Sequence, residues 1–153
     1  MRDRFQTLFA SHGGLVGKIA RAYARDSESR LDLEQEIAAQ AWRAYPSYDD
    51  ARARFSTWLF RVALNVAISH LRRARSFEPL GEVAVVPAFE DERIEAMYAS
   101  IRELEPLKRA LVLLYLEDRS YREIAETLGI SEANVAVRLT RIKAELRTQL
   151  KGA

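Results

Sequence analysis

Apolar side chains recur at helical spacing over most of the chain, and the pattern is most regular from residue 120 to residue 150. The first stripe there follows the i, i+3, i+4, i+7 spacing of one helical face. It consists of Tyr121, Ile124, Ala125 and Leu128. Ser120 and Glu123 have the spacing of a capping box at its start, and Gly129 can end it in the left-handed conformation. The pattern predicts a short, capped helix followed by a tight turn.

A second amphipathic helix is predicted after this turn, with Ser131 as its N-cap. Its apolar stripe, which must pack against other helices, consists of Val135, Leu139, Ile142, Leu146 and Leu150. The opposite face carries small and basic side chains, namely Ala133, Ala136, Val137, Thr140, Arg141, Ala144 and Arg147. The two helices and their turn predict a helix-turn-helix whose second helix enters the major groove of DNA. The alternative is an ordinary helical hairpin with a solvated basic face.

Three helices are predicted in the N-terminal half. The first has its apolar positions between Phe5 and Tyr23 and is expected to bend or break at Gly13-Gly14. A polar connection over residues 25–30 leads to the second helix, from about Leu31 to Tyr45, which stops before a proline. A loop then precedes a long helix from Phe55 to about Arg75. Because this helix is apolar around most of its circumference, we expect it at the centre of its module.

Residues 76–92 lack helical periodicity and contain Pro79, Gly81 and Pro87, so they are expected to form a flexible linker. A helix ending near Leu104 and another with Pro106 in its first turn are predicted to lead into the helix-turn-helix. The fold class is therefore all-α. Two small helical modules are expected, over residues 1–75 and 93–153.

Two polar stripes interrupt the apolar pattern of the N-terminal module. One lies on the predicted helix 31–45 and consists of Asp32, Glu36, Ala39 and Arg43, with Gln35 and Gln40 beside them. It is either a solvated face or a surface for a partner. The other lies on the long helix and consists of Trp58, Arg61, Asn65, Ser69 and Arg72. Aromatic and guanidinium groups in one line suit single-stranded nucleic acid, although Trp58 packed in the core and solvated arginines would give the same pattern.

The net charge of +2 conceals a segregation of charge along the chain. Residues 51–75 contain six arginines and no acidic residue, whereas residues 76–105 contain eight acidic residues and two arginines. From Glu132 to Lys151, five basic residues outnumber two acidic ones. Basic blocks on either side of an acidic spacer indicate that each module has a surface for a polyanion.

The composition excludes several classes of function. The chain has no cysteine, which rules out disulfides, thiolate metal sites and cysteine nucleophiles. Its two histidines, His12 and His70, lack metal-ligand spacing to carboxylates, and there is no glycine-rich phosphate loop or nucleophile motif. We therefore expect no catalytic residue, no metal and no cofactor. No apolar run approaches the length of a membrane span and no signal-peptide core is present, so we expect a cytoplasmic protein without membrane insertion of its own.

Three stretches together resemble the extracytoplasmic function (ECF) sigma factors of bacteria. They are DLEQEIAAQAWRAY (32–45), FSTWLFRVALNVAISHLRR (55–73) and LYLEDRSYREIAETLGISEANVAVRLTRIKAELR (114–147). The order, spacing and length agree over nearly the whole chain apart from the linker. The resemblance implies a sigma subunit that binds core RNA polymerase, melts the minus-10 region with its first module and reads the minus-35 element with its second.

The resemblance also implies roles for single residues. Those expected to bind the clamp of the polymerase largest subunit are Asp32, Gln35 and Glu36. Those expected at an unstacked base of the minus-10 non-template strand are Tyr48, at the start of the loop 48–54, with Phe55, Ser56, Trp58, Arg61 and Asn65. Those expected to hold phosphate nearby are Arg72, Arg73 and Arg75. An anti-sigma factor covering the polymerase-binding surfaces is a further implied partner.

The recognition helix departs from the family at one place. The family usually has a polar or basic residue followed by a serine where this chain has Ala136 and Val137. Methyl-bearing side chains can contact thymine methyls but cannot make bidentate hydrogen bonds to guanine. We therefore expect a weaker preference for guanine than is common in the family. Base contacts are expected from Ala136, Val137, Thr140 and Arg141, and phosphate contacts from Arg138 and Arg147.

Two other interpretations compete with a sigma factor. The first alternative is a stand-alone, dimeric helix-turn-helix regulator whose N-terminal half binds a ligand or a second copy of the chain. A palindromic footprint without polymerase would favour it, whereas the two polar stripes of the N-terminal module disfavour it. An enzyme is disfavoured by the missing motifs described above.

Overall fold

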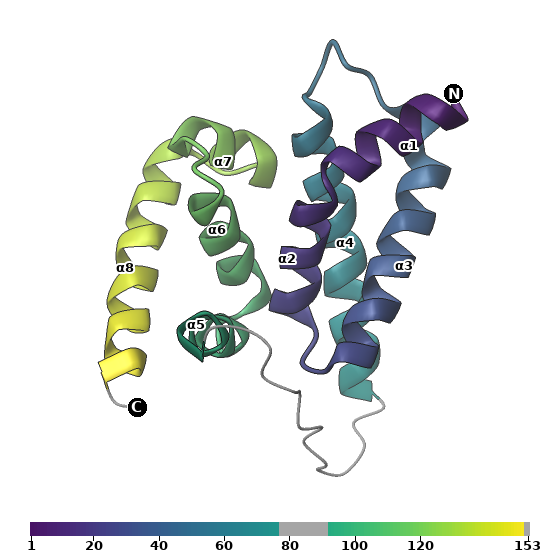
Figure 1. Ribbon diagram of the computed structural model, residues 1–153. Coiled ribbons are helices and arrows are strands. Elements are labelled where there is room, and N and C mark those ends of the chain that lie inside the picture. The colour runs from purple at the N-terminus through teal and green to yellow at the C-terminus, as the bar shows by residue number, and fades with distance from the viewer. Residues whose placement is uncertain (77–91, 152–153) are drawn as a thin grey trace. The chain divides into compact units, whose positions relative to one another are not determined.

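The computed structural model describes residues 1–76 and 92–151, and all of the regular elements within these ranges are helices (Figure 1). The chain divides into two compact units, Met1–Val86 and Pro87–Ala153, which we call the N-terminal and C-terminal modules. This architecture confirms the predicted all-α fold. The predicted linker lies almost wholly outside the described residues, and its end positions, Ser76 and Glu92, belong to helices.

The N-terminal module is built around three helices that pack on one another, namely α2 (Gly13–Tyr23), α3 (Ser27–Ala44) and α4 (Phe55–Ser76). Its fully buried side chains come from all three and include Ile19, Tyr23, Leu33, Ile37, Leu59 and Phe60. The first helix, α1 (Arg2–Ser11), precedes α2, and the chain breaks between them at His12. The break predicted at Gly13-Gly14 is therefore confirmed to within one residue.

The start of α3 differs from the sequence prediction. The helix begins at Ser27 rather than near Leu31, so most of the predicted polar connection is helical. Asp26 is its N-cap, because the backbone N–H of Ser29 donates to Asp26 Oδ1 at 2.7 Å. The hydroxyl of Ser29 donates to the other carboxylate oxygen at 3.1 Å. A capping aspartate satisfies an amide that would otherwise lack a partner, and this offsets the low helix propensity of the polar turn that follows.

The C-terminal module consists of α5 (Glu92–Arg102), α6 (Pro106–Leu116), α7 (Tyr121–Leu128) and α8 (Glu132–Lys151). Pro106 occupies the first turn of α6, as predicted. The core draws fully buried side chains from all four helices, including Ile101, Leu111, Ile124, Leu139 and Ile142. The α6–α7 turn contains Asp118 at φ 58°, the single non-glycine residue of positive φ in the described chain. Aspartate tolerates this region better than most residues.

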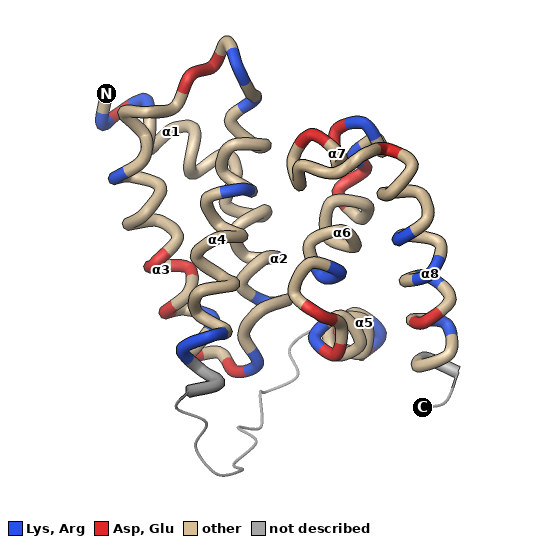
Figure 2. The backbone as a smooth tube through the Cα atoms, turned by 180° about the vertical axis from the view of Figure 1, so that it is seen from behind, with Lys and Arg blue, Asp and Glu red and all other residues tan. Residues whose placement is uncertain are grey.

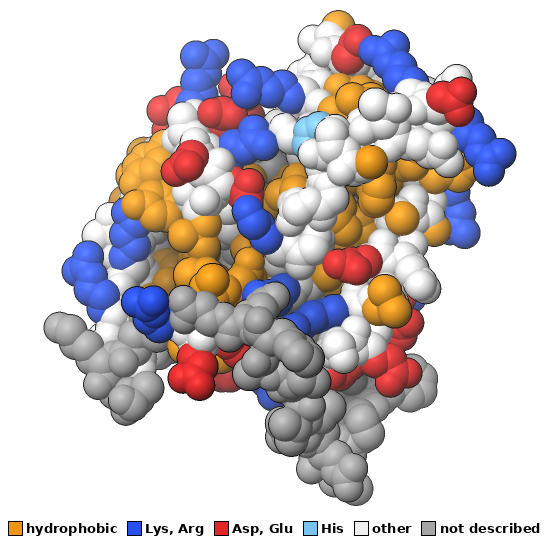
Figure 3. Space-filling view, in the orientation of Figure 1, with side chains coloured by type: hydrophobic (Ala, Val, Ile, Leu, Met, Phe, Trp, Pro, Cys, Tyr) orange, Lys and Arg blue, Asp and Glu red, His pale blue; other side chains and the backbone are white. Residues whose placement is uncertain are grey.

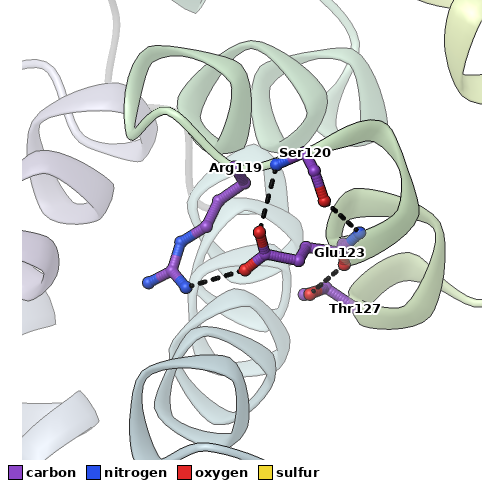
Figure 4. Close-up of polar contacts among 4 residues, drawn as sticks. All are labelled: Arg119, Ser120, Glu123 and Thr127. Atoms are coloured by element: carbon purple, nitrogen blue, oxygen red, sulfur yellow. Dashed lines mark hydrogen bonds and ion pairs between the residues drawn. The ribbon is translucent and has the colours of Figure 1, made fainter.

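The caps that the sequence predicts are present in the helix-turn-helix, and Figure 4 shows the one at the start of α7. The amide of Glu123 donates to Ser120 Oγ at 3.1 Å, and the amide of Ser120 donates to Glu123 Oε1 at 3.3 Å. Gly129 ends α7 at φ 70° and ψ 35°. Ser131 then caps α8, because its hydroxyl accepts from the amide of Asn134 at 3.1 Å. These contacts fix the direction in which α8 leaves the turn.

Candidate nucleic-acid interfaces

The capping box at the start of α7 also holds a charged pair. Glu123 Oε2 lies 3.4 Å from Arg119 Nη1, and Thr127 Oγ1 donates to the Glu123 carbonyl at 2.7 Å (Figure 4). Hydrogen bonds from Ser120, chiefly that of its backbone amide, lower the pKa of Glu123 below its ordinary value. The carboxylate therefore stays ionised as it fixes the turn that precedes α8.

The solvent-facing side of α8 carries the side chains predicted for an upstream promoter element. Val137, Thr140, Arg141 and Arg147 are exposed, with Val137 at 49%, whereas Ala136 and Arg138 are half-buried. Val135, Leu139 and Ile142 are buried on the opposite side, as predicted. Basic positions follow one another along α8 (Figure 2). In the space-filling view, basic side chains and a hydrophobic area lie together along the left edge, where α8 runs (Figure 3).

Two contacts within α8 restrict what its polar side chains can offer a ligand. Thr140 Oγ1 donates to the Ala136 carbonyl at 2.9 Å, so its hydroxyl proton is already used. Arg138 Nε donates to Asn134 Oδ1 at 2.8 Å, which fixes the base of the guanidinium group. Arg141 is exposed, and no internal hydrogen bond or ion pair holds it within the described part of α8. Of these three residues, it is the best placed to reach outward.

A cluster of aromatic rings joins the end of α3, the following turn and the start of α4. It consists of Tyr45 and Tyr48, from the short helix η1 (Tyr45–Ser47) and the loop after it, with Phe55 and Trp58 from α4. The rings of Tyr45 and Tyr48 stack with centroids 6.0 Å apart. Trp58 lies 5.1 Å from Tyr48 and 5.4 Å from Phe55. Three of the predicted minus-10 residues, Tyr48, Phe55 and Trp58, are therefore brought together.

The loop between η1 and α4 is held by Tyr48. Its hydroxyl donates to the Ala53 carbonyl at 2.9 Å. Burial, with a smaller contribution from the negative charge of Asp50, raises the pKa of Tyr48, so the phenol stays protonated. Asp50 itself lies 3.6 Å from Arg4 of α1, and both side chains are largely exposed. Acidic and basic positions follow Tyr48 along this loop (Figure 2).

Exposure divides the predicted minus-10 residues into three groups. Arg61, Asn65, Arg72 and Arg73 are exposed along α4, as is Ser69 of the same stripe. Tyr48 and Trp58 are half-buried, whereas Phe55 and Ser56 are only 6% and 9% exposed. Phe55 and Ser56 therefore lie beneath the surface, where they support the loop. The side chain of Arg75 lies outside the described residues.

Part of each polar stripe predicted for the N-terminal module lines one groove. This groove has a volume of about 650 Å³ and runs between α3 and α4. Glu36, Ala39, Gln40 and Arg43 line it from α3, and Asn65, Ser69 and Arg73 line it from α4. Asp32 and Gln35, the other predicted polymerase-binding residues, are exposed on α3. The predicted polymerase surface and the predicted DNA surface thus share a border.

One ion pair crosses that border. Arg73 Nη2 lies 2.6 Å from Glu36 Oε2, and His70 Nδ1 lies 3.8 Å from Glu36 Oε1. Arg73 is predicted to hold phosphate and Glu36 to bind polymerase, yet here each is the partner of the other. Sequence reasoning missed this pair, because the two residues are 37 positions apart. It also missed Tyr45, which belongs to the aromatic cluster, and Phe5, whose ring contacts that of Tyr45.

Other kinds of site find no support in the described residues. Within 1–76 and 92–151, no three histidine or acidic side chains are grouped closely enough to hold a metal ion. None of the helices in these ranges is long and apolar enough to cross a membrane.

Comparison with known proteins identifies both modules. Residues 8–77 match the family model of sigma-70 region 2, and residues 94–146 match that of sigma-70 region 4. The first match contains α3, the aromatic cluster and α4, and the second contains the helix-turn-helix. The helix-turn-helix is therefore accompanied by a second sigma module, and the stand-alone regulator is not favoured.

Curated relatives are similar over nearly the whole chain. The ECF RNA polymerase sigma factor SigM of Mycobacterium tuberculosis is 32% identical over 95% of this chain and 76% of its own length. The ECF RNA polymerase sigma factor SigM of Bacillus subtilis is 29% identical over 86% of each chain.

Solved structures share the fold. The sigma factor RpoE from Bartonella quintana, solved with the anti-sigma factor NepR, superposes with a TM-score of 0.80 at 21% identity, over 99% of this chain and 98% of that one. CnrH, solved with the cytosolic domain of CnrY, superposes with a TM-score of 0.72 at 24% identity, over 99% of this chain and 90% of that one. With both sigma modules present in order, the chain belongs to the ECF family of RNA polymerase sigma factors, which direct promoter-specific initiation of transcription.

Proposed function

We propose that this sigma factor divides promoter recognition between the two modules at the residues described above. The exposed face of α8 reads the minus-35 element, the aromatic cluster with α4 captures the minus-10 non-template strand, and α3 binds the polymerase clamp. The observation that carries the proposal is the groove between α3 and α4. Its lining includes three polar side chains of α3, suited to a protein partner, and three of α4, suited to DNA; they are Glu36, Gln40 and Arg43, and Asn65, Ser69 and Arg73.

At the minus-35 element, Arg141 is the side chain with the reach and freedom for a polar base contact. Ala136, Val137 and Thr140 present methyl groups near it, and such groups recognise the C5-methyl of thymine. Since the hydroxyl proton of Thr140 is used inside the helix, its methyl group is the more available contact. Arg138 and Arg147 hold phosphates on either side, which positions α8 without specifying sequence.

At the minus-10 element, the half-buried rings of Tyr48 and Trp58 form a platform on which an unpaired base can stack. The exposed Arg61 and Asn65 lie further along α4 and contact the same strand. Arg72 and Arg73 neutralise phosphate at the far end of the helix. Phe55 and Ser56 support this platform from beneath, since they are nearly inaccessible to solvent.

On the protein side, Asp32, Gln35 and Glu36 bind the clamp of the largest polymerase subunit. The solved neighbours with NepR and with CnrY are the motivation for a further partner, an anti-sigma factor that covers sigma surfaces. We also propose that the protein acts in the cytoplasm, where polymerase is found, and that it has no catalytic activity of its own. Its role is to bind core polymerase, to position it at the promoter and to melt the minus-10 region.

Run-off transcription tests this assignment directly. Purified core polymerase from a related bacterium is given fragmented genomic DNA with and without the protein, and new transcripts are mapped. Discrete new start sites with common upstream elements are expected. Asp32→Lys should remove them together with binding to core polymerase. Asp3→Lys, an equal change of charge in the same module but outside the α3 stripe, should leave both intact. If the wild-type protein neither binds core nor yields new transcripts, the assignment is wrong.

A further inference from the structure

The N-terminal helix α1 is attached to the module at the place where the predicted strand-capture loop begins. Phe5 is the buried residue of α1, at 6% exposure. Its ring lies 5.2 Å from that of Trp42 and 5.1 Å from that of Tyr45, measured between centroids. The match to sigma-70 region 2 starts at residue 8, so Phe5 lies outside it.

Tyr45 connects α1 to the loop. Besides Phe5, its ring contacts those of Tyr48, Phe55 and Trp58, at 6.0, 6.4 and 6.2 Å between centroids. Two of these rings, Tyr48 and Trp58, make the proposed base platform. Tyr45 thus lies between α1 and the two rings of the proposed base platform.

Two further sets of contacts involve the loop. Its backbone bonds are local: the amide of Arg52 donates to the Asp49 carbonyl at 3.1 Å, and that of Ala51 donates to Asp49 Oδ1 at 2.9 Å. The Arg4–Asp50 pair joins it to α1, but both side chains are about 71% exposed. Exposed pairs contribute little. The ring of Tyr48 joins the loop to the rings of Tyr45, Phe55 and Trp58.

We propose that α1 braces the strand-capture loop, with Phe5 and Tyr45 as positioning residues that hold the rings of Tyr48 and Trp58 in the orientation needed to receive a base. Neither residue touches DNA. Aromatic pairs with centroids 4.5–7 Å apart favour defined relative orientations of the rings, so a row of them transmits orientation from α1 to the platform. This inference rests on the proposed role of the loop at the minus-10 element.

The hydroxyl groups of Tyr45 and Tyr48 differ in their hydrogen bonds, and this difference decides which variants test the brace. The hydroxyl of Tyr48 donates to the Ala53 carbonyl, whereas none of the described residues hydrogen-bonds to the hydroxyl of Tyr45. Tyr45 therefore acts through its ring alone. Tyr45→Phe keeps the ring and should behave as the wild type, whereas Tyr45→Leu removes the ring and keeps an apolar side chain. In α1, Phe5→Leu removes the brace, and Phe9→Leu is the matched control, because Phe9 contacts Phe5 but no ring of the loop.

The experiment follows promoter opening by the holoenzyme on a promoter found by the run-off assay. Permanganate reactivity of minus-10 thymines gives the opening rate on duplex DNA, and a template already unpaired in that region bypasses the capture step. Tyr45→Leu and Phe5→Leu should open duplex DNA about two- to tenfold more slowly, a barrier change comparable to the energy of one aromatic pair. Transcription from the unpaired template and affinity for core polymerase should stay near the wild-type values. Tyr45→Phe and Phe9→Leu should open duplex DNA at the wild-type rate.

Two outcomes overturn the brace. One is a wild-type opening rate for Tyr45→Leu. The other is an equal loss on both templates together with weaker binding to core, which would mean that Tyr45 only stabilises the module. Amide hydrogen exchange of Ala51 and Arg52 in the free protein gives a second measurement, and faster exchange is expected in Tyr45→Leu. If the wild-type protein itself opened no promoter, the proposed role of the loop would fail, and the brace with it.

Discussion

Arg141 distinguishes two ways in which α8 can hold DNA. If it contacts a base edge, as proposed, Arg141→Ala should cost roughly 1–3 kcal/mol on the preferred minus-35 sequence and flatten the preference at one position. Arg147→Ala, the matched control at a proposed phosphate contact, should weaken binding to all sequences alike and reduce the salt dependence. Holoenzyme binding to a set of single-base promoter variants measures both. An equal loss on every variant for Arg141→Ala would reassign this residue to phosphate.

Ser120 tests how much the capping box contributes to the helix-turn-helix. Ser120→Ala leaves the amide of Glu123 without its acceptor, and we expect a loss of about 1 kcal/mol in the free energy of unfolding of the C-terminal module. Urea titration followed by far-UV circular dichroism measures this. A change within error would mean that water replaces the cap.

Glu123 makes the same box sensitive to acid. Its pKa in the folded protein lies below the ordinary value of 4.5, chiefly because of the hydrogen bond from the Ser120 amide. A group of this kind contributes stability above its unfolded pKa, and the contribution is lost as the pH falls through the folded pKa. We therefore expect the C-terminal module to lose stability progressively below about pH 4.5. In Glu123→Gln this part of the pH dependence should be absent, and an unchanged acid profile in that variant would contradict the assignment.

Local contacts of this kind could be predicted from the sequence, whereas contacts between distant residues could not. The box of Ser120 and Glu123 and the turn at Gly129 depend on residues within one helical turn, and the structure confirms them. The cap at Asp26 is equally local and could also have been predicted from the sequence. The polar residues after it were instead interpreted as a loop. The Phe5–Tyr45 contact joins positions 40 residues apart. Helical periodicity predicts that such residues are buried, but it does not predict which distant residues they contact.

At the scale of elements, one ion pair between α3 and α4 joins a residue proposed to bind polymerase, Glu36, to a residue proposed to bind phosphate, Arg73. While Glu36 holds Arg73, Arg73 is withheld from phosphate. Both side chains are substantially exposed, at 40% and 59%, so the pair is worth about 0.2–1 kcal/mol. Glu36→Gln should therefore raise the affinity of the free protein for nonspecific duplex DNA about two- to fivefold at low salt. The double variant with Arg73→Gln should lose this gain.

Fluorescence anisotropy over a range of salt concentrations measures this effect. The salt dependence of Glu36→Gln should steepen by about one phosphate contact. Unchanged binding would mean that the pair does not restrain Arg73. The groove itself could not be predicted from the sequence, although both of its walls could. Each polar stripe was identified from spacing along one helix, but only the packing of α3 on α4 brings part of each stripe to the same groove.

At the scale of the whole molecule, each module has its own core, so each should unfold as a separate unit. The tryptophans allow this to be observed without labels, because both of them, Trp42 and Trp58, belong to the N-terminal module. Tryptophan emission therefore reports on that module alone, whereas far-UV circular dichroism reports on both.

Circular dichroism should show two urea transitions, one for each module. Tryptophan emission should show only the transition of the N-terminal module. Ser120→Ala should shift the transition of the C-terminal module, which emission does not report. Tyr45→Leu should shift the transition of the N-terminal module. A single transition that both variants shift in both signals would show one cooperative unit. Separate unfolding fits the proposed mode of action, because two modules that bind DNA weakly alone gain affinity when a polymerase holds both near one promoter. The free protein should accordingly bind promoter DNA far more weakly than the holoenzyme does.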